Sequence, residues 1–276
     1  MTLISYVPHS GFGNQMVALN KAIHVALATN ATLLLPKILH HGDLSLGSCR
    51  IAISSTERLA SRYAHLKPHR LSIDKYIAVS QEVKTTTIEH DCTYTVHLKH
   101  ACGWDPIGLI RNQSFLSTSC IRLGSTFVMR QTTNHSVCRT SVKERWKQTV
   151  RERMINFTAW DVAHFRLTEG RAKQIPMESL TMSDETPLLI ITDDAEYATR
   201  IVANHTKRHI MLTQSLFDTT NMIETDRVVI DVTIAILARK FYASDTSSFS
   251  WFIQQQRRCS KKTQSDKATS RQFLQR

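Results

Sequence analysis

Hydrophobic and polar positions follow first a strand period and then a helix period at the start of the chain. Residues 3–7 (Leu-Ile-Ser-Tyr-Val) are β-branched or aromatic and predict a strand closed by Pro8. Between residues 16 and 30 the apolar residues recur at spacings of three and four, which predicts a helix. Residues 32–36 predict a second strand, so the pattern favours a parallel β-α-β crossover.

A glycine-containing turn joins the first strand to this helix. Its sequence is His9-Ser10-Gly11-Phe12-Gly13-Asn14-Gln15. Glycines allow a sharp turn and a close approach to a ligand, and the first N–H groups of a helix favour an anion. Asn14 adds an amide that both donates and accepts. Spacing alone leaves two interpretations open, a ligand-binding turn and a tight turn without a ligand.

Residues 37–140 show weaker patterns. Apolar fragments occur at 76–79 and 94–98, and residues 125–129 predict a strand. The histidines of this block match no metal-ligand spacing, so we assign no chemistry to it and treat it as the rest of the first domain.

A second periodic region begins at Ser141. Ser141-Val142-Lys143-Glu144 matches a capping box, and apolar residues follow every four positions up to Met154. The pattern predicts a helix of about four turns that crosses between two domains.

Strands and helices then alternate, which indicates a second α/β domain. Residues 161–166 alternate as a strand, with Arg166 at its carboxyl end, where a guanidinium suits phosphate oxygens. A surface salt bridge to Glu169 explains Arg166 equally well. Further strands are expected at 188–192 and 209–212. Asp193-Asp194 between them fits a helix N-cap better than a metal site.

The last organised block joins an apolar run, 228–238, to a serine-rich turn. Asp231 within the run needs a partner or solvent, because burying an unpaired carboxylate is costly. Residues 245–251 supply hydroxyl and N–H groups where a helix over 249–257 is expected. Plain Ser/Thr capping satisfies the same spacing.

Composition is that of a globular protein, with 42% hydrophobic and 21% charged residues. Of the net charge of +12, half lies in residues 257–276, which hold seven basic residues and one acidic residue. A solvated polar tail explains this better than a nucleic-acid arm, so no nucleic-acid partner is expected.

Cysteines and glycosylation patterns bear on the compartment. The six cysteines include no Cys-x-x-Cys pair, which disfavours a zinc site, and their even number permits disulfides. Five asparagines match the N-glycosylation pattern: Asn30, Asn112, Asn134, Asn156 and Asn204. We therefore expect the lumen of the secretory pathway, ER or Golgi. The sequence contains neither a signal peptide nor an apolar membrane span, so an upstream anchor outside this chain is expected.

Three stretches in this order resemble the GDP-fucose protein O-fucosyltransferase family. They are Gly11-Phe12-Gly13-Asn14-Gln15, His164-Phe165-Arg166 and Ser247-Ser248-Phe249-Ser250. The resemblance implies an α/β, GT-B-like fold with two Rossmann-like domains facing across a cleft. The expected bounds are 1–145 for the acceptor-side domain, 146–258 for the GDP-sugar domain and 259–276 for a basic polar tail.

The resemblance also implies roles for individual residues. Arg166 would hold the diphosphate and stabilise the leaving GDP, and Asn14 would lie beside the sugar and phosphate, both as catalytic residues. Asp231 looks like the residue that binds the guanine N–H groups. The other expected substrate contacts are Gly11, Phe12, Gly13, His164, Ser247, Ser248 and Phe249.

The implied activity is inverting transfer of fucose from GDP-fucose to a hydroxyl, expected on Ser or Thr of a protein, without a metal or other cofactor. The alternatives are a glycan acceptor and a catalytically degenerate, nucleotide-sugar-binding relative. Leu167-Thr168-Glu169-Gly170 departs from the family pattern after the arginine, and no general base is identified, since His9 is close to the motif only in sequence.

Overall fold

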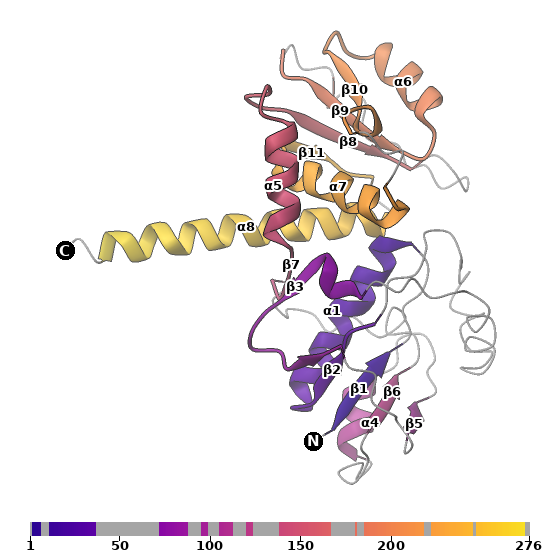
Figure 1. Cartoon of the computed structure of the whole chain (residues 1–276), viewed down its shortest axis with the longest axis vertical. Coiled ribbons are helices and arrows are strands. Elements are labelled where there is room, and N and C mark those ends of the chain that lie inside the picture. The colour runs from indigo at the N-terminus through magenta and orange to yellow at the C-terminus, as the bar shows by residue number, and fades with distance from the viewer. Residues whose placement is uncertain are drawn as a thin grey trace. The chain divides into compact units, whose positions relative to one another are not determined.

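The computed structural model describes residues 2–6, 11–36, 72–87, 95–98, 105–112, 120–123, 138–166, 180, 185–217, 222–244 and 247–273. The chain divides into two compact units, Met1–Ser141 and Val142–Arg276 (Figure 1). The division falls four residues before the end of the first domain expected from the sequence. The strand expected at 125–129 lies outside the described residues.

The first unit contains a parallel five-stranded sheet in the order β4-β2-β1-β6-β5. Its strands are β1 (Leu3–Tyr6), β2 (Thr32–Leu34), β4 (Thr85–Thr86), β5 (Thr95–Leu98) and β6 (Cys120–Leu123). Helix α1 (Phe12–Ala28) joins β1 to β2, and Leu3 pairs with Thr32 in parallel register. The predicted β-α-β crossover is therefore confirmed.

The remaining elements of this unit are short. They are η1 (Ile73–Lys75), β3 (Ile77–Val79), α4 (Pro106–Asn112) and β7 (Thr140–Val142), with β3 and β7 forming a two-stranded sheet. The predicted capping box is wrong, because Ser141 belongs to β7. Helix α5 (Glu144–Arg153) begins only after Lys143, which makes no side-chain cap hydrogen bond, and its ten residues fall short of the four predicted turns.

The second unit contains a parallel four-stranded sheet in the order β10-β9-β8-β11. The strands are β8 (Asp161–Phe165), β9 (Leu188–Thr192), β10 (Ile210–Leu212) and β11 (Lys240–Tyr242). The other elements are α6 (Ala195–Ala203), η6 (Thr213–Ser215), α7 (Glu224–Leu237) and α8 (Ser248–Phe273). Strands β8 and β9 match their predicted positions, as does the alternation of strand and helix.

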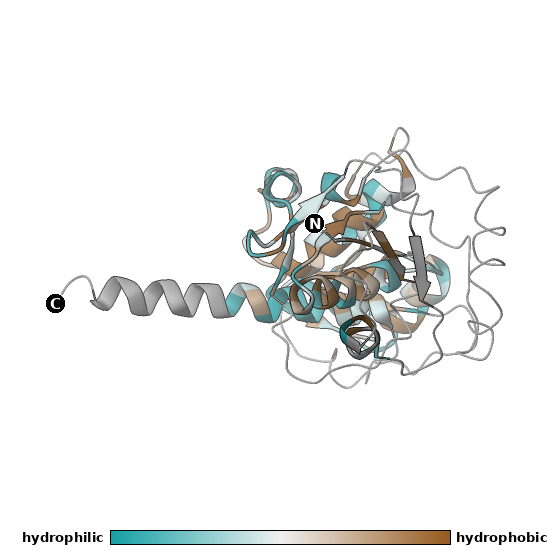
Figure 2. Cartoon of the chain, turned by 90° about the horizontal axis from the view of Figure 1, so that it is seen from below, coloured by the Kyte–Doolittle hydropathy of each residue, from teal (hydrophilic) through white to brown (hydrophobic). Residues whose placement is uncertain are grey.

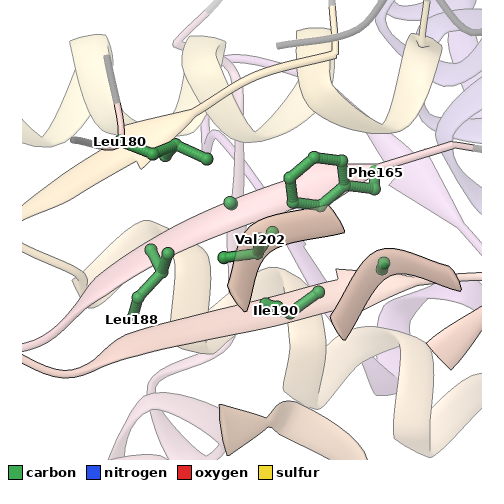
Figure 3. Close-up of a cluster of buried hydrophobic side chains, with 7 residues drawn as sticks. Phe165, Leu180, Leu188, Ile190 and Val202 are labelled. Atoms are coloured by element: carbon green, nitrogen blue, oxygen red, sulfur yellow. The ribbon is translucent and has the colours of Figure 1, made fainter. Parts of the chain in front are cut away.

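Helices cover both faces of this sheet, which is why all five residues of β8 are buried. On one face, Phe165, Leu188 and Ile190 pack against Val202 of α6 (Figure 3). Helix α7 packs on β8 and also contacts α5 and α8. Each fully buried Leu or Ile contributes about 1.5–3 kcal/mol relative to leaving it exposed. Figure 2 shows apolar residues concentrated on the inner strands and helices.

The N-terminal edge of the second sheet is held by a buried ion cluster. The Asp161 carboxylate accepts hydrogen bonds from Arg208 Nη2 at 2.8 Å and from Arg239 Nε and Nη2 at 2.9 and 2.8 Å. It also accepts one from the backbone N–H of Lys240 at 3.1 Å. Burial would raise the pKa of Asp161, but the hydrogen bonds and charges of Arg239 and Arg208 hold it below its usual value.

Helix α8 is longer than predicted. It runs to Phe273, so residues 259–273 are helical and the helix end expected at residue 257 is wrong. Residues 258–273 contain neither Gly nor Pro, and Lys, Arg, Gln and Ala favour continuation of a helix. Near its start, the Arg257 guanidinium donates to the carbonyls of Ala235, Ile236 and Ala238, which fixes α8 to the end of α7.

Candidate functional site

The carboxyl ends of the four parallel strands of the second unit gather polar residues along one edge of its sheet. Arg166 follows β8, Asp193 follows β9, Thr213 follows β10 and Ser244 lies just beyond β11. Ligands of open α/β sheets bind at this edge. The edge is therefore the candidate site, and it contains the arginine that the sequence placed there.

His164, near the end of β8, is held by a hydrogen bond and a ring contact from helix α8. Its Nδ1 atom lies 2.7 Å from the hydroxyl oxygen of Ser250. Its ring centroid lies 4.8 Å from that of Phe249. The structure thus brings together two of the stretches singled out in the sequence, His164-Phe165-Arg166 and Ser247-Ser248-Phe249-Ser250.

Burial dominates the protonation of His164. It lowers the pKa of His164 to about 4, with the Asp193 carboxylate opposing the shift and the Arg166 guanidinium adding to it. His164 is therefore neutral near pH 7. The two opposing influences also show that His164, Arg166 and Asp193 interact electrostatically.

The first turn of α8 supplies N–H groups at the same edge. Ser247 is buried, and its hydroxyl accepts a hydrogen bond from the backbone N–H of Ser250 at 3.5 Å, in the geometry of an N-cap. Ser248 and Phe249 occupy the first two helical positions and are half-buried. The structure thus supports the capping interpretation of Ser247, while the helix end remains suited to an anion.

Asp231 lies in α7 and is half-buried. Burial of its carboxyl raises the pKa of Asp231 to about 6, although a hydrogen bond with the Thr213 side chain opposes the shift. The Thr213 hydroxyl also lies 3.3 Å from the carbonyl oxygen of Ile190. The partner required for this carboxylate is therefore Thr213, at the carboxyl end of β10.

The glycine turn lies in the first unit. Gly11 is the N-cap of α1 with φ −64° and ψ 166°, and Gly13 lies in the first helical turn. Neither supports the sharp glycine turn that the sequence suggested, because both conformations are open to other residues. Phe12 is a buried core residue, and Asn14 is half-buried in the same turn. Gly11 has no side chain to cap the first N–H groups.

The paired aspartates have different surroundings. Asp194 is the N-cap of α6, and its Oδ1 accepts a hydrogen bond from the backbone N–H of Tyr197 at 3.0 Å, which confirms the capping interpretation. Among the described residues, no group of three or more His, Cys, Asp or Glu side chains is placed to hold a metal ion.

Several expectations stay untested because their residues lie outside the described part of the chain. They concern His9 and Glu169. Sequence reasoning did not identify Ser244 or Thr213 as part of the edge. Ser250 was included only within the Ser247-Ser248-Phe249-Ser250 stretch, without a role of its own.

Comparison with known proteins relates the chain to fucosyltransferases. No family model matches it. O-fucosyltransferase 30 of Arabidopsis thaliana is 31% identical over 84 residues, which are 30% of this chain and only 17% of that protein.

Solved structures match over almost the whole chain. POFUT1 in complex with GDP-fucose superposes with a TM-score of 0.60 at 9% identity, covering 93% of each chain. Fucosyltransferase NodZ from Bradyrhizobium superposes with a TM-score of 0.54 at 12% identity, covering 92% of this chain and 91% of that one. The chain therefore has the fold of these fucosyltransferase structures, which confirms the expected α/β, GT-B-like class.

Proposed function

We propose that the chain is a glycosyltransferase that moves fucose from GDP-fucose to a hydroxyl acceptor with inversion. One observation carries the proposal: His164 contacts both Ser250 and Phe249. His164 and Ser250 are 86 residues apart in the sequence. It joins, at the carboxyl edge of a parallel sheet, two of the three stretches on which the family resemblance rests. Similarity to fucosyltransferases, one of them complexed with GDP-fucose, supports the donor.

The edge has the charges and donors that a nucleoside diphosphate requires. In the proposal, Arg166 and the first N–H groups of α8 bind the diphosphate. Negative charge grows on this group as the sugar departs, so fixed donors there stabilise the transition state more than the ground state. Asp231 accepts hydrogen bonds from the guanine N–H groups, which requires its ionised form.

We assign the remaining expected contacts to the same reaction. Ser247 and Ser248 lie at the phosphates and Phe249 beside the nucleoside. The roles expected for Gly11, Phe12, Gly13 and Asn14 concern the first unit and stay predictions. In the proposal, Arg166 and the N–H groups of α8 offset the negative charge of the diphosphate, so no step is assigned to a metal.

The proposed acceptor is a Ser or Thr hydroxyl of a protein, in line with the name of the matched O-fucosyltransferase. A sugar hydroxyl is the second candidate, because one of the similar structures is named NodZ alpha-1,6-fucosyltransferase. The two are distinguished by offering folded protein domains and oligosaccharides as acceptors in parallel and locating the fucose by mass spectrometry.

We also propose that the protein works in the lumen of the ER or Golgi. Cys120, Cys138 and Cys259 are disulfide-bonded, as expected in an oxidising compartment. The acceptor asparagines Asn30, Asn156 and Asn204 are exposed. Among the described residues, no helix combines the length and apolarity needed to cross a membrane. The location is tested by treating the protein isolated from cells with a glycosidase and measuring whether its mass decreases.

The central test measures GDP release from GDP-fucose by the purified protein, with GDP-mannose as the comparison donor. We expect release selective for GDP-fucose, and a loss of about 10²–10³-fold in Arg166→Ala, as for removal of one donor at a developing charge. Arg200→Ala, an exposed arginine on α6, is the matched control and should retain the activity.

If no GDP is released, a separate calorimetric measurement of GDP binding distinguishes the explanations. Binding without turnover in the presence of acceptors would contradict the transferase and favour the degenerate relative. An absence of binding would overturn both.

A further inference from the structure

Ser250 is the centre of a small buried hydrogen-bond network. Its hydroxyl oxygen accepts from the backbone N–H of Ser244 at 3.0 Å and lies 2.7 Å from Nδ1 of His164. Ser250 is 1% exposed, Ser244 4% and His164 8%. The network thus joins three elements: the end of β8, the chain after β11 and the first turn of α8.

The direction of the hydrogen bond between Ser250 and His164 follows from counting protons. A hydroxyl has one proton and accepts at most two hydrogen bonds. If His164 donated, the Ser250 oxygen would accept twice and its own proton would be buried with no acceptor among the described residues, at a cost that folded proteins rarely bear. If Ser250 donates to Nδ1, the Ser250 proton, His164 Nδ1 and the Ser244 N–H all have partners.

This direction fixes the tautomer of the imidazole. A neutral ring whose Nδ1 accepts must carry its proton on Nε2. The ring is neutral near pH 7, as its lowered pKa requires. Within the described part of the chain, Nε2 makes no hydrogen bond, so its N–H is available to a ligand beside Arg166.

We propose that Ser250 is a positioning residue: its hydroxyl holds His164 as the Nε2–H tautomer, so that the ring donates a hydrogen bond to the anionic part of the bound nucleotide. The inference rests on the proposed function for the identity of the ligand, but not for the tautomer. Without the Ser250 hydroxyl, Nδ1 loses its donor and the ring is free to place the proton on Nδ1, which turns a donor toward the anion into an acceptor.

The first experiment examines the free protein by nitrogen-15 NMR with labelled histidine, and His164→Gln identifies the His164 signals. We expect Nε2 protonated and Nδ1 unprotonated at pH 7 in the wild type. Ser250→Ala should shift these signals toward the other tautomer, and Ser250→Thr, which keeps the hydroxyl, should restore them. Protonated Nδ1 in the wild type, or unchanged signals in Ser250→Ala, would overturn the inference.

The second experiment measures the dissociation constant of GDP. We expect Ser250→Ala to weaken binding by about tenfold, which is about 1.4 kcal/mol, and Ser250→Thr to bind within about twofold of the wild type. Ser260→Ala is the matched control, because Ser260 lies on the same helix and, among the described residues, its hydroxyl donates to the Gln256 carbonyl alone.

Equal affinity in Ser250→Ala and wild type would contradict the positioning role. If wild-type protein binds no GDP, the proposed function fails, while the tautomer measurement still decides what Ser250 does to His164. A fold defect in the alanine variant leaves the wild-type tautomer as the deciding result.

Discussion

The hydroxyl oxygen of Ser250 lies 2.7 Å from Nδ1 of His164, joining the first turn of α8 to the end of β8. The contact lies at the edge of the sheet where the candidate ligand residues gather, and burial keeps this histidine neutral. The same burial makes the stability of the second unit dependent on pH.

Acidification should destabilise the protein through His164. The pKa of His164 is about 4 in the folded protein and 6.5 when exposed. Between these values the unfolded chain binds more protons, so the free energy of unfolding falls as pH drops from 6.5 to 4, by about 2–3 kcal/mol. His164→Asn should lack this part of the pH dependence in urea titrations. The exposed His205→Asn is the control, and an identical pH profile for all three proteins would refute the prediction.

Asp231→Asn should stabilise the protein at neutral pH. The pKa of Asp231 is about 6 when folded and 3.8 when exposed, so the folded state binds more protons between these values. Its contribution is therefore favourable at low pH and is lost as pH rises through 6. We expect a gain of about 1–2 kcal/mol at pH 7.5 by denaturant unfolding, reduced from the full shift because the residue is half-buried.

The same substitution should weaken GDP binding if Asp231 contacts the guanine. Glu152→Gln, an exposed carboxylate on α5, controls for the loss of one charge. A less stable Asp231→Asn at pH 7.5 would show that the carboxylate is better compensated than its raised pKa indicates.

Asp161→Asn should destabilise the second unit strongly. The change removes the charge between Arg208 and Arg239, and Arg208 is 7% exposed. Breaking a buried ion pair by removing one partner costs about 3–5 kcal/mol. Thermal unfolding measures the loss.

Glu144→Gln is the control, because it disrupts only exposed ion pairs, with Lys147 and Arg151, and should cost less than about 1 kcal/mol. If the two substitutions lowered the stability equally, the ion cluster at Asp161 would contribute no more than a surface pair.

The two adjacent aspartates after β9 should respond differently to alanine. Asp194→Ala removes the N-cap of α6 and should cost about 1 kcal/mol, whereas Asp194→Ser should recover most of it. Asp193→Ala should leave the helix intact. It should instead lower the pKa of His164 further, because the Asp193 charge opposes the effect of burial. NMR titration and thermal unfolding distinguish the two effects.

The sequence predicted a strand or helix correctly where the hydrophobic pattern within that one segment determines it. The continuous apolar run Leu188 to Ile191 lies in β9, and the segment with helical spacing after Gly11 forms α1. The capping box at Ser141 failed because pairing of β7 with β3 overrode a local motif. The basic residues after 257 predict a polar tail, but their high helix propensity lets α8 continue to Phe273.

The candidate site was only partly predictable. Arg166 could be placed because an arginine after an apolar strand marks the carboxyl edge of a sheet. The partners of Asp231 and His164 could not, since Thr213 and Ser250 come from other elements, and their distances depend on the strand order and on how α7 and α8 pack. For the same reason Asp161 read as an ordinary strand end rather than as the centre of an ion cluster.

Strand β8 has Asp161 at its first residue, His164 next to its last, and Arg166 directly after it. One end contributes to folding, and the other carries the groups proposed to act on the nucleotide. Arg166 lies outside the buried strand and is half-exposed, so its replacement should cost little folding free energy, whereas replacement of Asp161 disrupts a buried ion cluster. In the proposed function, the nucleotide site could therefore lose its arginine without loss of the fold.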